Sequence, residues 1–249
     1  MEYLNPKELI ANRKVVKARL VKFTGPTIRH KTGIRIVNSC FRKFLAAVAP
    51  REETKILDCG VAGGGFVQDL HEAGFKDLYG LDIDDYLAEE RRELLKGFKT
   101  ADLSFDKIPW FDNFFHIVTA WCVLPHLENP HNFVREAHRV LKPGGLFVIS
   151  LINIASPPQR RYFFKYGDFP AYHERNNHIS FFTPAVFEKT ILKYFELAGV
   201  DYFITPRIFN GWRGKIRKLV RRVCSLNPAW ESKLKDRWGA KIIYILKKP

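Results

Sequence analysis

The sequence has few cysteines, no long apolar run and no internal repeat. Its four cysteines are scattered and none belongs to a CxxC pair, which excludes a disulfide framework and a zinc ribbon. The longest apolar stretch, residues 144–155, is interrupted by Ser150 and Asn153 and is shorter than the roughly 20 residues that span a bilayer. The first ten residues lack the basic-then-apolar pattern of a secretory signal. These absences predict a cytoplasmic protein that holds no metal.

The charge of the chain is positive and unevenly distributed. Hydrophobic residues make up 46% of the 249 residues and charged residues 27%, which is typical of a globular protein. The formal net charge is +15, of which residues 1–54 carry +8, residues 55–204 carry −4 and residues 205–249 carry +11. Two basic flanks serve solubility in many proteins. They also favour an anionic substrate, a nucleic acid or a membrane surface as a partner.

Apolar segments of strand length alternate with amphipathic segments of helix length along most of the chain. The expected strands are 55–59, 77–81, 98–101, 115–121, 146–151, 200–204 and 240–246. The expected helices are 5–21, 36–48, 66–73, 86–95, 130–141 and 184–197, with a turn at 142–145. This alternation predicts an α/β fold with an open, doubly wound, mostly parallel seven-stranded sheet whose last strand is antiparallel.

The flanks and inserts predict a domain organisation. Residues 1–53 are expected to form a basic N-terminal helical cap, and residues 54–249 the main domain. Two inserts rich in aromatic or basic side chains, 153–182 and 206–238, interrupt the alternation late in the chain. We expect these inserts to form a lid over the substrate.

A glycine-rich turn follows the first expected strand. The pattern Gly60-x-Ala62-x-x-Gly65 nearly satisfies the dinucleotide pattern GxGxxG, and such a turn lets backbone N–H groups approach a ligand. However, a pyrophosphate needs a bare backbone where Ala62 adds a methyl group, and the carboxylate of Asp58 would face the anion. A cationic ligand suits this turn better. A strand–turn–helix that binds nothing is the alternative.

Two further acids follow the next two expected strands. Asp82 ends the second strand, where a carboxylate can accept hydrogen bonds from both hydroxyls of a ribose. Asp102 follows the third strand and is placed to accept from an exocyclic amine such as that of adenine. The alternatives are a helix-capping role for Asp82 and an ordinary loop acid for Asp102.

From about Lys55 to Leu151 the chain resembles the class I S-adenosylmethionine-dependent methyltransferases, and within them the type 11-like quinone-biosynthesis and glycan branches. The resemblance rests on residues 57–64, 80–84, 101–103 and 115–145, and the run RVLKPGG at 139–145 is its most specific part. It implies S-adenosylmethionine as cofactor, with the glycine turn on its methionine part, Asp82 on the ribose and Asp102 on the adenine amine. The implied cofactor-binding residues are Asp58, Gly60, Ala62, Gly64, Asp82, Ile83, Asp102, Leu103 and Trp121. Ala62 and His116 depart from the usual glycine and aspartate of the family.

Methyl transfer to a hydroxyl benefits from a general base, and histidine is the usual base near neutral pH. His126 follows the fourth expected strand, and His178 lies in the first insert and resembles a histidine of the glycan and quinone branches. We expect these two residues to be catalytic, with His173 as a third candidate. The alternatives are a packing role for His126 and a backbone-bonded loop role for His178.

The inserts indicate where the acceptor binds. Residues 157–182 interleave aromatic and basic side chains, which could stack on a sugar or aromatic acceptor and hold its acid groups, or pack a lid. Residues 213–223 place apolar side chains at helical spacing opposite a cationic face, which suits peripheral contact with an anionic membrane or an ordinary surface helix.

The sequence therefore predicts an enzyme that methylates an oxygen of an anionic small molecule, glycan or glycolipid precursor. RNA or tRNA is the alternative acceptor, and nucleic acid is the less favoured partner. A module that binds S-adenosylmethionine without turnover is the alternative from another functional class.

Overall fold

The computed structural model describes residues 28–172, 177–204 and 239–249, together with separate residues between 205 and 238 (Ile216, Leu219, Val220, Arg222, Val223, Cys224 and Asn227). These residues fall into two compact units. The first takes in the chain up to residue 102 and residues 115–117, and the second takes in residues 103–114 and the chain from 118 onward. The expected helix 5–21, His173 and most of the insert 206–238 lie outside the described residues.

The first unit is built on three parallel strands: β1 (Ile56–Cys59), β2 (Leu78–Asp82) and β3 (Gly97–Thr100). Ile56 pairs with Leu78, and Tyr79 pairs with Gly97. All four residues of β1 are buried, as expected of a strand covered on both faces. His116 belongs to this unit, and its Nδ1 accepts the backbone N–H of Lys55 at 2.9 Å. The histidine that departs from the family pattern therefore joins two strands.

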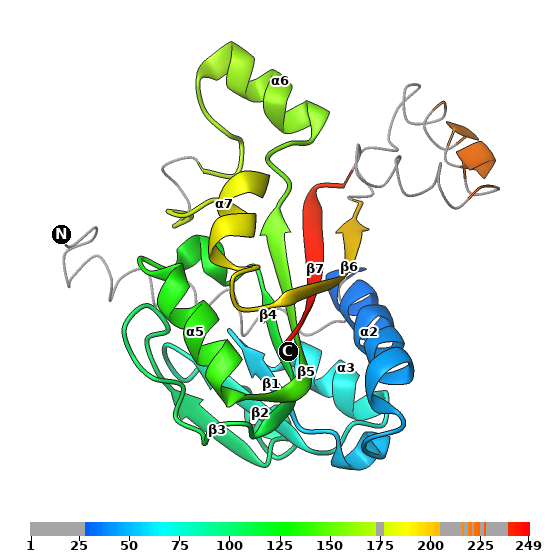
Figure 1. Ribbon diagram of the computed structural model, residues 1–249, viewed down its shortest axis with the longest axis vertical. Coiled ribbons are helices and arrows are strands. Elements are labelled where there is room, and N and C mark those ends of the chain that lie inside the picture. Colours follow the sequence, from blue (N-terminus) through cyan, green and yellow to red (C-terminus); the bar gives the residue numbers. More distant parts are fainter. Residues whose placement is uncertain are drawn as a thin grey trace. The chain divides into compact units, whose positions relative to one another are not determined.

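Helices α2 (Ile28–Cys40) and α3 (Gly65–Glu72) of this unit lie side by side next to these strands (Figure 1). α3 follows β1, and α4 (Glu89–Arg92) follows β2. α2 continues into a π-helical turn at Phe41–Leu45, and a 3₁₀ turn at Arg51–Glu53 leads into β1. α2 lies beside α3, where His30 Nδ1 is 3.0 Å from Asp69 Oδ2. The N-terminal segment expected to be helical therefore packs on the helix that begins at the glycine turn.

The second unit holds β4 (Phe115–Trp121) beyond its first residues, β5 (Leu141–Ile152), β6 (Glu196–Phe203) and β7 (Lys241–Lys247). The strand order of the whole sheet is β3-β2-β1-β4-β5-β7-β6. β7 is antiparallel to both of its neighbours, and Lys241 lies opposite Ile152 and Phe203. β6 consequently runs parallel to β5. The predicted open, mostly parallel seven-stranded sheet with an antiparallel last strand is confirmed.

The helices of the second unit begin where capping chemistry places them. α5 (Pro130–Val140) starts with proline, and the Asn129 side chain accepts the N–H of Asn132. α7 (Pro184–Thr190) also starts with proline and is capped by Thr183, which accepts the N–H of Val186. A 3₁₀ turn at Leu124–His126 follows β4, and α6 (Pro157–Tyr166) follows β5. Proline at the first position fits because that N–H has no partner within the helix.

Several predicted elements were wrong in extent. The helix expected at 36–48 begins at Ile28, and its α-helical part ends at Cys40. The segment 142–145, expected to be a turn, lies within β5, and Gly144 there has a positive φ of 76°. The segment pairs with the end of the chain, because the N–H of Lys248 donates to the carbonyl oxygen of Gly145 at 2.9 Å. The helix expected at 86–95 is limited to α4, since Ala88 has an extended backbone. The helix expected to reach residue 197 ends at Thr190, because β6 begins to pair at Glu196. In the described part of the chain, no helix is long and apolar enough to cross a membrane.

Candidate functional site

The glycine turn of the first unit has a strained backbone. Gly60, Ala62 and Gly64 have φ values of 75°, 49° and 78°. Ala62 is the unusual member, since a residue with a Cβ pays roughly 1–2 kcal/mol in the left-handed region. The N–H groups of Gly60 and Val61 both donate to the carbonyl oxygen of Leu81, at 2.8 and 3.2 Å. The turn is therefore folded back onto the end of β2.

Asp82 holds this turn in place. Its Oδ2 accepts the N–H of Ala62 and its Oδ1 accepts the N–H of Ile83, each at 2.8 Å. A carboxylate has about four acceptor positions, so about two remain for a ligand that carries adjacent hydroxyl groups. Burial raises the pKa of Asp82 above its ordinary value, the two N–H groups work against this rise, and the charge of Asp84 adds to it. The carboxylate both fixes the turn and can bind a diol.

The remaining predicted residues of the first unit lie at the same edge of its sheet, where the strands end. Asp58 is buried within β1, and the exposed Gly60 follows that strand. Asp102 is half-buried just beyond β3, where the preceding N–H, that of Ala101, donates to the Asp82 carbonyl oxygen at 3.0 Å. Because β1, β2 and β3 are parallel, their carboxyl ends lie together. The first unit thus brings together these predicted residues: Asp58, Gly60, Ala62, Gly64, Asp82, Ile83 and Asp102.

Arg91 supports the turn from α4 and was not foreseen from the sequence. It is buried, its Nη1 donates to the carbonyl oxygen of Gly63 at 2.8 Å, and its Nε donates to Gln68 Oε1 at 3.2 Å. A Cβ on Gly64 would lie 2.9 Å from the Cβ of Arg91. Gly64 is therefore required by packing as well as by its positive φ. Nothing in the run EERRE distinguishes this arginine from its neighbours.

The groups of this edge fit S-adenosylmethionine, the cofactor that the resemblance implies. Asp82 suits the ribose hydroxyls, and Asp102 suits the adenine amine, since a carboxylate is an acceptor for both. Asp58 and the absence of a basic side chain among the predicted residues suit a cationic ligand rather than a pyrophosphate. When bound, this cofactor supplies an activated methyl group on a sulfonium.

The second unit contains a pair of histidines. His126 closes the 3₁₀ turn after β4, and its ring centroid lies 4.5 Å from that of His178. His126 Nδ1 is 3.2 Å from the Asn177 carbonyl oxygen, and His178 Nδ1 is 2.6 Å from the Ala171 carbonyl oxygen. A carbonyl can only accept, so Nδ1 of each neutral ring carries the proton and Nε2 carries the lone pair. The structure brings the two predicted catalytic residues together.

The surroundings of His126 keep it neutral. Loss of water around the ring lowers its pKa, and the neighbouring His178 and the charge of Lys241 lower it further, while the bond to Asn177 acts in the opposite direction. His126 as a whole residue is nevertheless exposed, so part of it faces solvent. A neutral imidazole with its lone pair on Nε2 can accept a proton from a hydroxyl.

The segment that carries His178 is fixed to the turn that carries His126. The N–H groups of Ile179 and Ser180 donate to the Pro125 carbonyl oxygen at 2.7 and 3.1 Å. Ser180 Oγ also donates to the Leu127 carbonyl oxygen at 2.8 Å, and Tyr172 Oη donates to the Ser180 carbonyl oxygen at 3.1 Å. The spacing of the histidine pair is therefore set by backbone bonds rather than by the imidazoles alone.

A thiol and a lysine lie near this pair. Cys122 follows β4 with a φ of 61°, and its N–H donates to Ser150 Oγ at 3.0 Å. Lys241 opens β7, and its Nζ donates to Cys122 Sγ. Burial raises the pKa of Tyr172 to about 12, with a contribution from Cys122, so this phenol stays protonated. Lys241 was not predicted from the sequence as a residue of this site, although a cation at the start of an otherwise apolar strand could have indicated it.

Two predicted cofactor residues belong to the second unit. Leu103 is buried at the start of that unit, and Trp121 is half-buried at the end of β4. Their role toward the cofactor stays a prediction.

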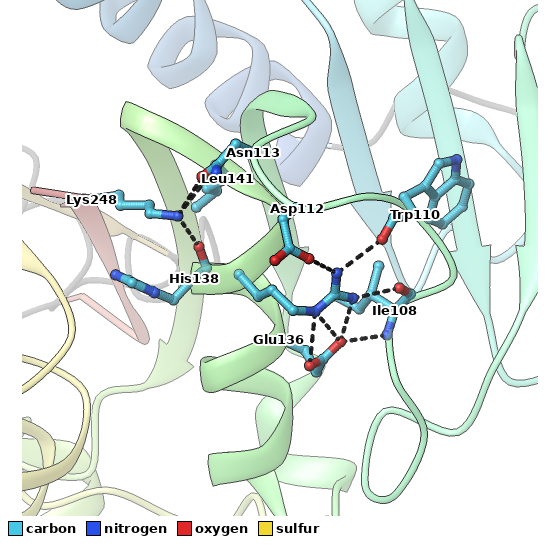
Figure 2. A network of polar contacts seen from close by, with 9 residues as sticks. Ile108, Trp110, Asp112, Asn113, Glu136, His138, Leu141 and Lys248 are labelled. Carbon is cyan, nitrogen blue, oxygen red and sulfur yellow. Dashed lines mark hydrogen bonds and ion pairs between the residues drawn. The ribbon is translucent and has the colours of Figure 1, made fainter.

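The run that most resembles the family has a structural role (Figure 2). Arg139 donates to both carboxylate oxygens of Glu136, to Asp112 Oδ1 and to the carbonyl oxygens of Ile108 and Trp110, over 2.6–3.1 Å. Glu136 Oε2 also accepts the N–H of Ile108 at 2.8 Å. Burial alone would raise the pKa of Glu136, but the bonds from Arg139 and Ile108 lower it. This network ties the loop 108–112 to α5.

Lys248 adds further bonds at the same, carboxyl-terminal end of α5. Its Nζ donates to Asn113 Oδ1 and to the carbonyl oxygens of His138 and Leu141, over 2.7–2.9 Å (Figure 2). Burial lowers the pKa of Lys248, and Asp112 acts in the opposite direction. The side chains of Arg139 and Lys248 therefore hold backbone segments together.

Comparison with protein families supports this description. Residues 57–149 match the family described as "Methyltransferase domain". A demethylmenaquinone methyltransferase of Chlorobaculum parvum is 25% identical over 126 residues, which is 50% of this chain and 52% of that protein. A ubiquinone biosynthesis O-methyltransferase of Maricaulis maris is 30% identical over 135 residues, 47% of this chain and 48% of that protein. A tRNA U34 carboxymethyltransferase of Syntrophotalea carbinolica is 25% identical, covering 46% and 39%.

The chain spans about half the length, or less, of the curated relatives it matches. Among solved structures, an S-adenosylmethionine-dependent methyltransferase from Mesorhizobium loti has a TM-score of 0.51 at 17% identity, over 82% of this chain and 95% of that one. The [4+2]-cyclase SpnF has a TM-score of 0.56 at 16% identity, over 87% and 81%. These similarities concern the fold alone, since a methyltransferase and a cyclase share it.

The matched domain, the strand order and the acidic residues at the ends of β1, β2 and β3 agree with one another. Residues 57–149 therefore form a methyltransferase domain, and the sheet that contains them has the fold of the class I S-adenosylmethionine-dependent methyltransferases.

Proposed function

We propose that this protein transfers the methyl group of S-adenosylmethionine to an oxygen of a small organic or glycan acceptor that carries negative charge. The observation that carries the proposal is the His126–His178 pair, because a neutral imidazole with an accessible lone pair suits deprotonation of a hydroxyl. Methyl transfer from a sulfonium requires alignment and exclusion of water, and a base is added when the acceptor is an alcohol or phenol.

Each residue has a proposed role. Asp82 and Asp102 bind the ribose and adenine of the cofactor, and the turn from Gly60 to Gly64 lies along its methionine part. Asp58 complements the cationic end of the ligand, and Ile83, Leu103 and Trp121 provide apolar contact. His126 accepts the acceptor's proton at Nε2, and His178 orients His126.

The acceptor class is inferred from charge and from relatives. Lys241 lies close enough to His126 to lower its pKa, so it can attract an anionic group of the acceptor. A relative named as an O-methyltransferase supports oxygen as the methylated atom. We further propose that the inserts 153–182 and 206–238 form the acceptor lid, and that residues 213–223 contact an anionic membrane surface, since Ile216, Leu219, Val220 and Val223 are helical and exposed.

RNA is the second candidate acceptor. The net charge of +15 and the similarity to a tRNA carboxymethyltransferase favour it. RNA binding would weaken steeply with salt, because phosphate contacts release counterions. A cofactor-binding module without turnover is the remaining alternative.

Transfer of a radiolabelled methyl group to fractionated acceptors tests the proposal. We expect label in anionic hydroxyl compounds or glycolipid precursors, with the product identified as a methyl ether by mass spectrometry. Loss of this label in His126→Asn, but not in His131→Asn, would support the assigned base. Label in tRNA would replace the proposed acceptor, and no label in any fraction despite cofactor binding would favour the inactive module.

A further inference from the structure

α6 is a helix without a single buried side chain. Every residue from Pro157 to Tyr166 is exposed except Gln159, which is half-buried. In Figure 1 the helix stands apart from the strands of its own unit. A helix of this length is marginal in water, and helices of folded proteins are stabilised chiefly by packing of one face. The packing that would stabilise α6 must therefore come from a partner surface.

The composition of α6 indicates the chemistry of that partner. The helix carries four aromatic and three basic side chains and no acidic one: Tyr162, Phe163, Phe164, Tyr166, Arg160, Arg161 and Lys165. Phe164 is 83% exposed. Arg160 and Arg161 lie four and three positions before Phe164, so all three project from one side of the helix. A single face thus presents an apolar ring between two cations.

We propose that α6 binds an anionic lipid bilayer, with Phe164 inserted at the boundary between headgroups and acyl chains and both arginines on lipid phosphates. A bilayer offers negative charge directly above an apolar layer, which matches a ring flanked by cations. A helix that instead packed on this chain's own core would have to bury the two arginines beside Phe164, at a large desolvation cost.

The aromatic side chains also connect α6 with the histidine pair. The rings of Phe163 and Phe169 stack at 5.0 Å, Phe169 lies 6.3 Å from Tyr172, and Tyr172 lies 5.5 Å from His178. A lipid-embedded acceptor with a hydroxyl group would meet this row of rings on its way from the bilayer to His126. This second step rests on the proposed function, whereas the bilayer contact does not.

Flotation with vesicles tests the bilayer contact. The full chain is mixed with vesicles of phosphatidylcholine alone or with about three parts phosphatidylserine in ten. We expect the protein to bind the anionic vesicles and Phe164→Ser to bind them about tenfold more weakly, because the inserted ring is lost. Phe111→Ser is the matched control, since Phe111 is also 80% exposed in the second unit, and its binding should stay within about twofold of the unaltered protein.

A second comparison separates local from overall charge. Arg160→Gln with Arg161→Gln removes the same charge as Lys189→Gln with Lys193→Gln, which alters exposed lysines of α7 and of the turn that follows it. We expect the arginine variant to bind about tenfold more weakly and the lysine variant about twofold more weakly. Calorimetric binding of S-adenosylhomocysteine in solution confirms that each variant is folded, and it keeps this test independent of methyl transfer.

Two results would overturn the inference. If Phe164→Ser and Phe111→Ser bound anionic vesicles equally well, α6 would not be the contact. If Leu219→Ser abolished binding while Phe164→Ser retained it, the membrane contact would belong to residues 213–223 instead, since Leu219 is 64% exposed there.

Discussion

The Arg139 network and the His126–His178 pair lie in the same unit, and they use polar side chains in opposite ways. Arg139 directs all three guanidinium nitrogens at protein acceptors, and Glu136 beneath it is buried (Figure 2). His126 makes its bond through Nδ1, and the residue as a whole is exposed. The Arg139 guanidinium, whose nitrogens all donate to protein acceptors, holds the fold together, whereas the His126 ring, which keeps a lone pair, can react.

This difference explains why the run most typical of the family is remote from chemistry. Arg139 lies within RVLKPGG, and its bonds fix the loop 108–112 on α5. The residues expected to act on the acceptor lie instead in a short turn after β4 and in an insert. A motif that identifies a family can therefore report how the fold is built rather than where it reacts.

The largest effect should come from the histidine. His126→Asn removes the proposed base, so we expect kcat to fall about 10²–10⁴-fold while the free energy of unfolding stays nearly unchanged. Initial rates and urea denaturation measure the two quantities. His131→Asn, which alters a half-buried histidine elsewhere in the same unit, should leave the rate unchanged. Equal rates for His126→Asn and the unaltered protein would remove this residue from the mechanism.

Arg139 should show the reverse behaviour. Arg139→Met leaves the Glu136 carboxylate without its cation, so we expect about 3 kcal/mol of destabilisation. The double variant Arg139→Met with Glu136→Leu should be less destabilised than the single one, because no unpaired charge remains. Cofactor affinity below the melting temperature should be retained. A stable Arg139→Met protein with no activity would contradict the structural role.

Asp82→Ala should weaken binding of S-adenosylhomocysteine by about 1–3 kcal/mol, because a ligand-facing acceptor is lost and the turn loses its support. Calorimetry measures the change. Asp84→Ala removes a neighbouring carboxylate whose Oδ1 accepts the N–H of Asp85, and it should bind almost normally. Unchanged affinity in Asp82→Ala would mean that the ribose binds elsewhere.

The smallest effect concerns pH. The pKa of His126 is lowered from its ordinary value of 6.5, and the neutral form is the proposed base. Activity should therefore be nearly constant, within about twofold, from pH 7 to 8 and should fall as pH drops through the lowered pKa. Removing His178 should raise that pKa and move the acidic limb of the profile upward. A limb that does not move in His178→Asn would show that the two rings are not coupled.

The sheet and the acidic residues at its edge were predictable because they follow from local patterns. Apolar runs that end in Gly60 or Asp82 mark the ends of parallel strands, and β4 was predicted with its observed bounds. The supporting contacts were not predictable. Arg91 reaches a carbonyl 28 positions away in the chain, and Lys241 reaches a thiol 119 positions away. No local pattern encodes partners at such separations.

The sequence also failed to predict the bounds of elements that depend on pairing with distant parts of the chain. The run Lys142 to Gly145 has the composition of a turn, yet it lies in β5 because Gly144 and Gly145 bond to Lys248 near the end of the chain. The helical character of α6 was hidden by its aromatic content and paired prolines, although Pro157 at the first position is favourable for a helix.

The most direct measurement is calorimetric titration of the protein with S-adenosylhomocysteine, with NAD as the control. We expect binding of the first with a dissociation constant on the order of micromolar and no binding of the second, since the turn and its acids suit a cationic cofactor rather than a pyrophosphate. Failure of the folded protein to bind S-adenosylhomocysteine, or binding of NAD in its place, would contradict the assignment of this edge of the sheet as the cofactor site.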